Sequence, residues 1–159
     1  MTSVLIVCTA NICRSPMAEA ILKKLVLDRL DADQWHIESA GTWAHNGSPA
    51  AALAQIVMGK MGIDISAHRS QSTSLKLLKE SDLVLTMEYE HKKYLRAQYG
   101  EFADRIYMMS EIVDEKFDIP DPIGGELADY ENIAFMLEKI LRDGLEKIHQ
   151  LARLHQQEI

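Results

Sequence analysis

The feature that most constrains the fold is a short apolar run that leads into a polar loop and then into a helix start. Residues 4–7 are all apolar and mostly β-branched, which predicts a strand buried on both faces. At the end of the loop we expect Ser15 to cap a helix and Pro16 to take its first position. This order directs backbone N–H groups and the positive end of a helix dipole to one point, which predicts an anion site.

Two side chains of this loop carry chemistry. Cys8 lies at the entry, where the field that holds an anion also stabilises a thiolate. Arg14 lies at the exit and presents a planar fork that suits two phosphate oxygens. An inert strand cysteine is the alternative for Cys8, but its flanks favour a nucleophile. The expected phosphate-binding residues are Thr9, Ala10, Asn11, Ile12, Cys13 and Arg14.

Length and composition limit the possible classes of protein. The chain of 159 residues is expected to form one domain, residues 1–159. A net charge of −7 argues against nucleic acid as a partner, since phosphate backbones require a basic face. No window approaches the roughly 18 apolar residues that cross a bilayer, so we expect no membrane partner and a cytoplasmic location. The two cysteines, five positions apart, form neither a disulfide framework nor a zinc site, and no metal or cofactor is expected.

Apolar periodicity predicts an alternation of strands and helices. Strands are expected near residues 4–8, 35–40, 82–87 and 105–109, and helices near residues 15–30, 50–61, 72–80, 88–99 and 130–154. The acidic stretch 114–129 holds two prolines and a Gly-Gly pair and is expected to be loop. The pattern predicts an α/β fold: a doubly wound four-stranded parallel sheet with helices on both faces and an N-terminal phosphate-binding loop. Such sheets bind ligands at the carboxyl ends of their strands, where this loop lies.

Residues 8–16, Cys-Thr-Ala-Asn-Ile-Cys-Arg-Ser-Pro, resemble the phosphate loop of the low-molecular-weight protein tyrosine phosphatases. The motifs at 39–42, 62–66, 82–87 and 121–122 follow in the family's order and spacing, so the resemblance covers nearly the whole chain. It implies a metal-independent enzyme that hydrolyses phosphotyrosine through a cysteinyl-phosphate intermediate. It also implies a phosphotyrosine protein or peptide as substrate, a bacterial tyrosine kinase as partner, and inorganic phosphate or vanadate as inhibitor.

The resemblance assigns three residues to the chemical steps. Cys8 would take the phosphoryl group, and Arg14 with the loop amides would hold its three equatorial oxygens. Asp121 would protonate the leaving oxygen and later accept a proton from water. The alternative for Asp121 is a plain turn residue, because Asp-Pro favours turns.

The same resemblance assigns supporting roles around the loop. Ser15 would donate a hydrogen bond to the sulfur. Asn11 would brace the loop from inside, with Ser39 and His68 as its partners.

Other residues concern regulation and specificity. Cys13 would form a reversible disulfide with Cys8 under peroxide, and the alternative is a small apolar filler. Trp43 would form a wall of the substrate cleft, together with Ile12 and Ile123, and the alternative for Trp43 is core packing.

Three departures from the family pattern keep a second substrate open. Ala10 stands where the family usually has glycine, which matters if that position needs a positive φ. Ile123-Gly124-Gly125 follows Asp121-Pro122 where tyrosine-specific members place aromatic residues, and this loop resembles that of the protein arginine phosphatases. Ile12 stands where those members carry threonine, which favours phosphotyrosine. The remaining alternatives are a thiol phosphocarrier and a non-catalytic phosphate-binding module.

Overall fold

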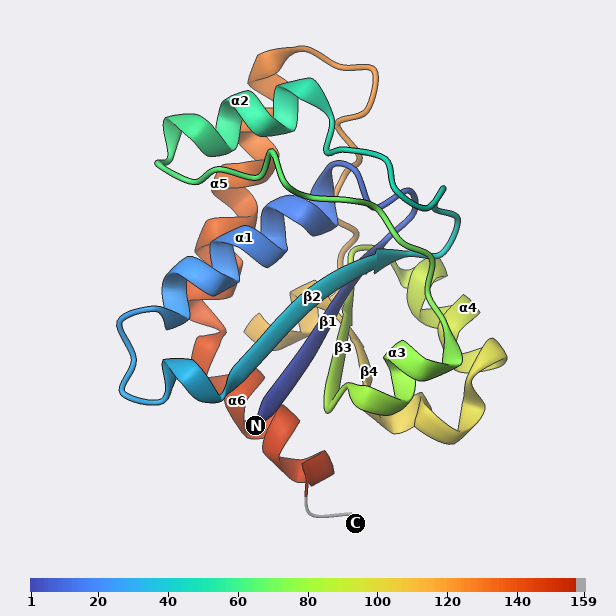
Figure 1. Cartoon of the computed structure of the whole chain (residues 1–159). Helices are drawn as coiled ribbons and strands as arrows, with labels where there is room; N and C mark the ends of the chain where they lie inside the picture. Colours follow the sequence, from blue (N-terminus) through green and yellow to red (C-terminus); the bar gives the residue numbers. More distant parts are fainter. Residues whose placement is uncertain (157–159) are drawn as a thin grey trace.

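The structure is a computed structural model that describes residues 1–156. Within these residues four strands form one parallel sheet in the order β2-β1-β3-β4, with β1 and β3 inside it (Figure 1). The strands are β1 (Thr2–Cys8), β2 (Trp35–Gly41), β3 (Leu83–Thr86) and β4 (Ile106–Met108). The predicted four-stranded parallel sheet is therefore confirmed.

Helices cover both faces of the sheet. One face carries α1 (Arg14–Val26), α5 (Leu127–Asp143) and α6 (Leu145–Gln156), with α2 (Ala52–Lys60) packed beyond them on α5 (Figure 1). The other face carries α3 (Leu75–Glu80) and α4 (Tyr89–Gln98) (Figure 1). The connections also contain the 3₁₀ helices η1 (Ala32–Gln34), η2 (Gly100–Arg105) and η3 (Met109–Val113). The doubly wound α/β architecture is confirmed, and no helix within residues 1–156 is long and apolar enough to span a membrane.

Alternation along β1 explains why its sequence is apolar throughout. Val4 and Ile6 belong to the larger core beneath α1 and α5, whereas Leu5 and Val7 belong to a smaller core beneath α3 and α4. All four are at most 1% exposed, as in a strand covered on both faces. Cys8 continues the alternation toward the larger core, so its sulfur lies on the α1 side of the sheet.

The chain changes direction across the sheet at β1, whose neighbours are β2 on one side and β3 on the other. Loops follow the carboxyl ends of β1 and β3 at this point, and α/β sheets usually bind ligands there. The segment after β3 stays close to β1, because Met87 donates its N–H to the carbonyl of Val7 at 2.9 Å. Ile119 in turn donates to the carbonyl of Met87 at 2.8 Å, which brings the acidic loop to the same edge.

The prediction of one helix over residues 130–154 is wrong. Two helices, α5 and α6, meet at Gly144, and α5 begins three residues earlier than expected, at Leu127. A Cβ on Gly144 would lie 2.5 Å from Cγ1 of Ile112, so this position must lack a side chain for η3 to pack against it. The apolar repeat continues through the junction, which is why periodicity alone predicts one helix.

Candidate active site

The predicted phosphate loop joins the end of β1 to the start of α1. The prediction that Ser15 caps the helix is wrong, because α1 begins at Arg14 and its N-cap position is Cys13. The prediction that Pro16 takes the first helical position is also wrong, because it is the third residue of α1; it still lies in the first turn, where its missing N–H has no helical acceptor to lose. Because Ser15 is not used as a cap, its hydroxyl is available to the sulfur of Cys8.

The sulfur of Cys8 lies at the floor of the loop and is held by two polar groups. Its Sγ lies 2.9 Å from Oγ of Ser15 and 3.3 Å from the backbone nitrogen of Asn11, which donates to it. Cys8 is only 3% exposed. Both contacts suit a thiolate, which accepts hydrogen bonds but donates none.

Asn11 braces the loop from within. It is fully buried and has a left-handed backbone, with φ of +58°, which asparagine tolerates better than most residues. Its amide nitrogen donates to Oγ of Ser15 at 2.8 Å and to Oγ of Ser39 at 2.9 Å. Because Ser15 accepts from Asn11, the Ser15 hydroxyl proton is left for the sulfur of Cys8.

The orientation of the Asn11 amide is determined by a backbone donor. The N–H of Gln71 donates to Oδ1 of Asn11 at 3.0 Å, so the amide nitrogen must face the two serines. The network continues toward the surface, because the hydroxyl of Ser39 donates to Oε1 of Glu19 at 2.7 Å. His68 lies 2.8 Å from the carbonyl of Asn11, so the expected partners Ser39 and His68 both contact it.

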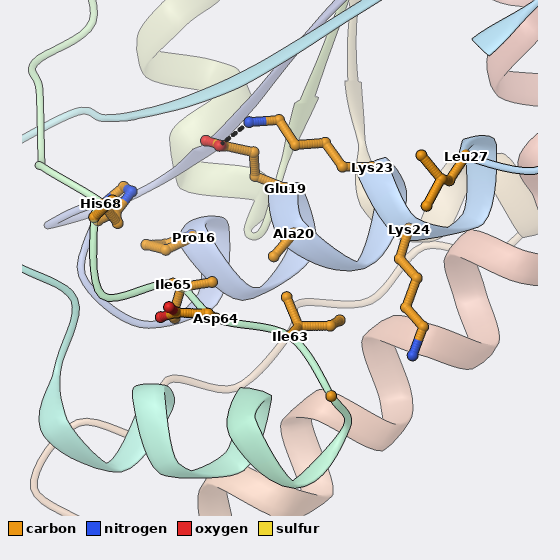
Figure 2. A pocket seen from close by; sticks show the side chains of 12 residues that line it. Pro16, Glu19, Ala20, Lys23, Lys24, Leu27, Ile63, Asp64, Ile65 and His68 are labelled. Carbon is orange, nitrogen blue, oxygen red and sulfur yellow. Dashed lines mark hydrogen bonds and ion pairs between the residues drawn. The ribbon is translucent and has the colours of Figure 1, made fainter.

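The outer members of this network reach a surface pocket. A pocket of about 610 Å³ lies between α1 and residues 62–68. Figure 2 shows Glu19 and His68 among the residues that line it, near the start of α1. Glu19 also pairs there with Lys23 at 2.7 Å, as the dashed line in Figure 2 marks. The network behind the phosphate loop therefore ends at solvent and at a charged helix face.

Two small residues lie in the phosphate loop or directly against it. Ala10 does not adopt a positive φ, since Asn11 and Asp114 are the non-glycine residues within 1–156 that do. Alanine at position 10 therefore introduces no left-handed strain. Gly41, at the end of β2, lies so close that a Cβ there would come within 2.3 Å of the carbonyl oxygen of Thr9.

Arg14 joins the phosphate loop to two distant segments. Its side chain is 2% exposed, and its Nη1 donates to Oε2 of Glu88 at 2.6 Å and to the carbonyl of Ile119 at 2.7 Å. Its Nη2 lies 3.4 Å from Oδ2 of Asp121. The guanidinium is therefore held in one orientation, and the carboxylate of Asp121 lies beside it across 107 positions of sequence.

Two hydrogen bonds fix the loop that carries Asp121, one within the loop and one to α4. Oδ1 of Asp121 accepts the N–H of Ile123 at 3.0 Å, which closes an Asx turn. Oδ1 of Asp118 accepts the N–H of Tyr89 at 2.8 Å, which joins the loop to the first residue of α4. The Asp121 side chain remains 39% exposed, so it is accessible to a substrate.

The expected cleft residues differ in exposure. Trp43 is 78% exposed and Ile123 is 55% exposed, whereas Ile12 is half-buried. Core packing, the alternative for Trp43, is therefore excluded. The backbone of Trp43 is nevertheless fixed, because its N–H donates to the carbonyl of Thr9 at 2.9 Å.

Cys13 lies on the inner side of the loop. It is buried, and its sulfur lies 3.5 Å from the hydroxyl of Tyr130 on α5. Burial raises the pKa of the Cys13 thiol to about 11, despite an opposing effect of the Tyr130 hydrogen bond. Neither Cys13 nor Cys8 is in a disulfide, and Cys13 is protonated at neutral pH.

Sequence reasoning missed four residues of the site. They are Glu19, Gln71, Glu88 and His91, each in contact with a predicted residue. Glu88 and His91 could have been found from the sequence, because they lie in the segment that follows the apolar strand 83–86. Ligand sites occur at the carboxyl ends of such strands. Glu19 and Gln71 had none, since their contacts depend on tertiary packing.

Three comparisons agree on the relatives of this chain. Residues 3–156 match the family model of the low molecular weight phosphotyrosine protein phosphatases. The probable low molecular weight protein-tyrosine-phosphatase EpsP of Ralstonia solanacearum is 34% identical, over 86% of this chain and 89% of its own length. The protein-arginine-phosphatase of Bacillus subtilis is 32% identical, over 87% of this chain and 91% of its own length. A solved low molecular weight protein tyrosine phosphatase from T. tengcongensis superimposes with a TM-score of 0.85 and 40% identity, covering 92% of this chain and 99% of that one.

Proposed function

The chain belongs to the low molecular weight phosphotyrosine protein phosphatase family, and we propose that it hydrolyses phosphotyrosine in proteins through a cysteinyl-phosphate intermediate. The observation that carries this proposal is the guanidinium of Arg14. It lies beside the loop that holds Cys8 and, at 3.4 Å, beside the carboxylate of Asp121. A phosphate-holding group, a sulfur and a carboxylic acid are the three parts that such a reaction needs.

The first step in this proposal transfers the phosphoryl group. The thiolate of Cys8 attacks phosphorus while the bond to the tyrosine oxygen breaks, and Asp121 gives its proton to that oxygen. Arg14 and the loop amides hold the three equatorial oxygens, over which the charge spreads. A phenol has a pKa of about 10, so its departure without a proton at neutral pH would be slow.

The second step releases phosphate. Asp121, now a carboxylate, takes a proton from water as the water oxygen attacks phosphorus and the bond to sulfur breaks. Ser15 donates to the departing thiolate, since Asn11 occupies the acceptor side of its hydroxyl. Neither of the proposed steps requires a metal or cofactor.

Two substitutions test these roles. We expect Cys8→Ser to abolish turnover while vanadate or inorganic phosphate still binds, because the loop amides and Arg14 remain. We expect Asp121→Asn to slow aryl phosphates more as the pKa of the leaving phenol rises. Near-normal turnover by Cys8→Ser, or equal slowing across the phenol series by Asp121→Asn, would contradict the assignment.

Phosphoarginine is the second candidate substrate. It is favoured by the Bacillus subtilis relative and by Pro122-Ile123-Gly124-Gly125, in which Gly124 has a φ of +79° and Gly125 lies against Asp129. Against it stands Ile12, whose side chain lacks a hydroxyl and presents an apolar surface to a flat ring. We therefore rank phosphotyrosine first.

A direct comparison of substrates decides between the two. Rates on a phosphotyrosine peptide and on a phosphoarginine peptide are measured for the unaltered protein and for Ile12→Thr. Preference of the unaltered protein for phosphotyrosine, with a shift toward phosphoarginine in Ile12→Thr, supports the first candidate. Preference of the unaltered protein for phosphoarginine refutes it and makes the second candidate the function.

We also propose the setting in which the enzyme acts. The substrate would be a phosphotyrosine protein, with a bacterial tyrosine kinase as the opposing partner and inorganic phosphate or vanadate as inhibitor. The reaction would take place in the cytoplasm, which keeps the free thiols of Cys8 and Cys13 reduced. Copurification of phosphotyrosine proteins with Cys8→Ser tests this setting.

A further inference from the structure

A histidine that the proposed reaction does not use lies against the phosphate loop. His91 lies in the first turn of α4 and is 6% exposed. Its Nε2 lies 2.8 Å from Oγ1 of Thr9, the residue that follows Cys8. Thr9 thus has a second anchor, since its backbone carbonyl already accepts the N–H of Trp43.

The hydrogen bonds of His91 determine its protonation state. The backbone N–H of Glu88 donates to Nδ1 of His91 at 3.1 Å, so Nδ1 carries no proton. A neutral imidazole then carries its proton on Nε2, which donates to Oγ1 of Thr9. The hydroxyl proton of Thr9 remains free, because Oγ1 has no further partner among the hydrogen bonds of residues 1–156.

His91 also lies beside the carboxylate that orients Arg14. Its Nε2 is 3.6 Å from Oε2 of Glu88, the same oxygen that accepts from Nη1 of Arg14 at 2.6 Å. A neutral ring leaves this oxygen to Arg14. A protonated ring would compete for it and would also turn a second donor, Nδ1–H, toward the N–H of Glu88.

We propose that His91 is a positioning residue, which in its neutral form holds Thr9 and Glu88 in place and so keeps the phosphate loop and Arg14 in their binding geometry. The proposal rests on the proposed function, because it concerns how the same loop binds phosphate. Protonation of His91 removes the acceptor for the Glu88 N–H and makes the ring a competitor of Arg14 for the Glu88 carboxylate, while Nε2–H still donates to Thr9. Activity is therefore lost on the acidic side as His91 takes up a proton.

The charges around His91 determine where this loss occurs. Burial lowers the pKa of His91 from its ordinary value, and the positive charge of Arg14 acts in the same direction. The carboxylates of Glu88, Asp118 and Asp121 oppose that shift. The net direction is downward, so the ring is neutral at pH 7 and protonates only at a pH below its ordinary pKa. The value of kcat/KM should then fall as the pH decreases through this lowered pKa.

Three variants separate positioning from simple structural support. His91→Gln keeps an acceptor for the Glu88 N–H and a donor for Thr9 but does not titrate, and glutamine is common at this position of a helix start. His91→Leu removes both hydrogen bonds. Thr9→Val removes only the acceptor on the loop side. His36→Gln, on a histidine side chain that is 56% exposed on β2, is the matched control.

Aryl phosphate hydrolysis from about pH 5 to about pH 8 provides the measurement, with vanadate inhibition as a readout of binding. We expect His91→Leu and Thr9→Val each to raise KM and weaken vanadate binding by about tenfold, the effect of one or two buried hydrogen bonds. kcat should change less. The double variant His91→Leu with Thr9→Val should add little to His91→Leu alone, because His91→Leu already removes the contact with Thr9. His91→Gln should stay closer to the unaltered protein at pH 7.5 and should show a weaker acidic decline of kcat/KM than the His36→Gln control.

The refuting results are distinct from failure of the proposed function. An unchanged acidic decline in His91→Gln, or an unchanged KM in Thr9→Val, would overturn the role of His91 in an otherwise active phosphatase. If the unaltered protein hydrolyses no phosphotyrosine or phosphoarginine, the proposed function itself fails. If His91→Leu does not fold, Thr9→Val and His91→Gln still decide the question.

Discussion

Replacement of Asn11 should produce the largest loss of stability within the phosphate loop. In Asn11→Ala three hydrogen bonds disappear: the buried ones to Ser15 and Ser39 and the part-buried one from the N–H of Gln71. At about 1 kcal/mol each, their loss destabilises the fold by about 3 kcal/mol. Alanine must also adopt the φ of +58°, which costs about 1 kcal/mol more.

Asn11→Gly separates these two contributions. Glycine loses the same three hydrogen bonds but accepts a positive φ freely, so its loss should be smaller by about 1 kcal/mol. Urea unfolding gives both free energies of unfolding, and Asn132→Ala, on an exposed position of α5, is the control. In a chain of this size, a loss of about 4 kcal/mol lowers the melting temperature by about 8–16 °C.

The same variants should impair catalysis, because Ser15 loses the donor that leaves its own proton for Cys8. We expect kcat on an aryl phosphate to fall more than tenfold in both. A loss of stability below about 1 kcal/mol in Asn11→Ala would refute the bracing role of this residue. Equal losses for alanine and glycine would refute only the strain contribution.

Three further outcomes are expected. Cys13→Ser should leave Cys8 open to irreversible oxidation. After peroxide treatment, dithiothreitol should therefore restore activity to the unaltered protein but not to this variant; equal recovery would contradict a protective disulfide. Gly144→Ala should destabilise the fold by about 1–3 kcal/mol in urea unfolding, because its Cβ would lie 2.5 Å from Ile112; an unchanged unfolding midpoint would show that η3 yields at no cost. Trp43→Ala should raise KM for phosphotyrosine peptides several-fold with kcat nearly unchanged, since the exposed ring would flank the substrate; an unaffected KM would remove Trp43 from the cleft.

The fold was predictable because its strongest signals are local. The apolar runs around Leu5 and Val84 predict buried strands, and alternation with helices predicts a parallel sheet. The errors lie where a local pattern conceals a tertiary contact. Gly144 resembles any tolerated helix glycine until Ile112 is packed against it, and Ser15 resembles an ordinary cap until its hydroxyl is seen beside the sulfur of Cys8.

The residues of the candidate site also differ in whether local sequence could predict them. The loop that follows β1 is one continuous segment, so Cys8, Asn11 and Arg14 could be proposed from their spacing and from the family resemblance. The partners of Arg14 could not, because Glu88 and the carbonyl of Ile119 lie 74 and 105 positions away in the chain. They reach Arg14 only through the pairing of β3 with β1 and the hydrogen bonds that follow it.

This separation has a consequence for how the site is held together. The sulfur is held by groups close to it in sequence, Ser15 in the first turn of α1 and the N–H of Asn11, whereas the guanidinium of Arg14 is held by segments beyond β3. Loosening of the β3 side, through Glu88 or the acidic loop, should therefore weaken phosphate binding while the surroundings of the sulfur persist. Loosening at Asn11 should first alter the surroundings of the sulfur, because it frees Ser15. Phosphate binding through Arg14 should be affected less. The reactivity of the thiol and the affinity for phosphate are thus adjusted by different parts of the chain.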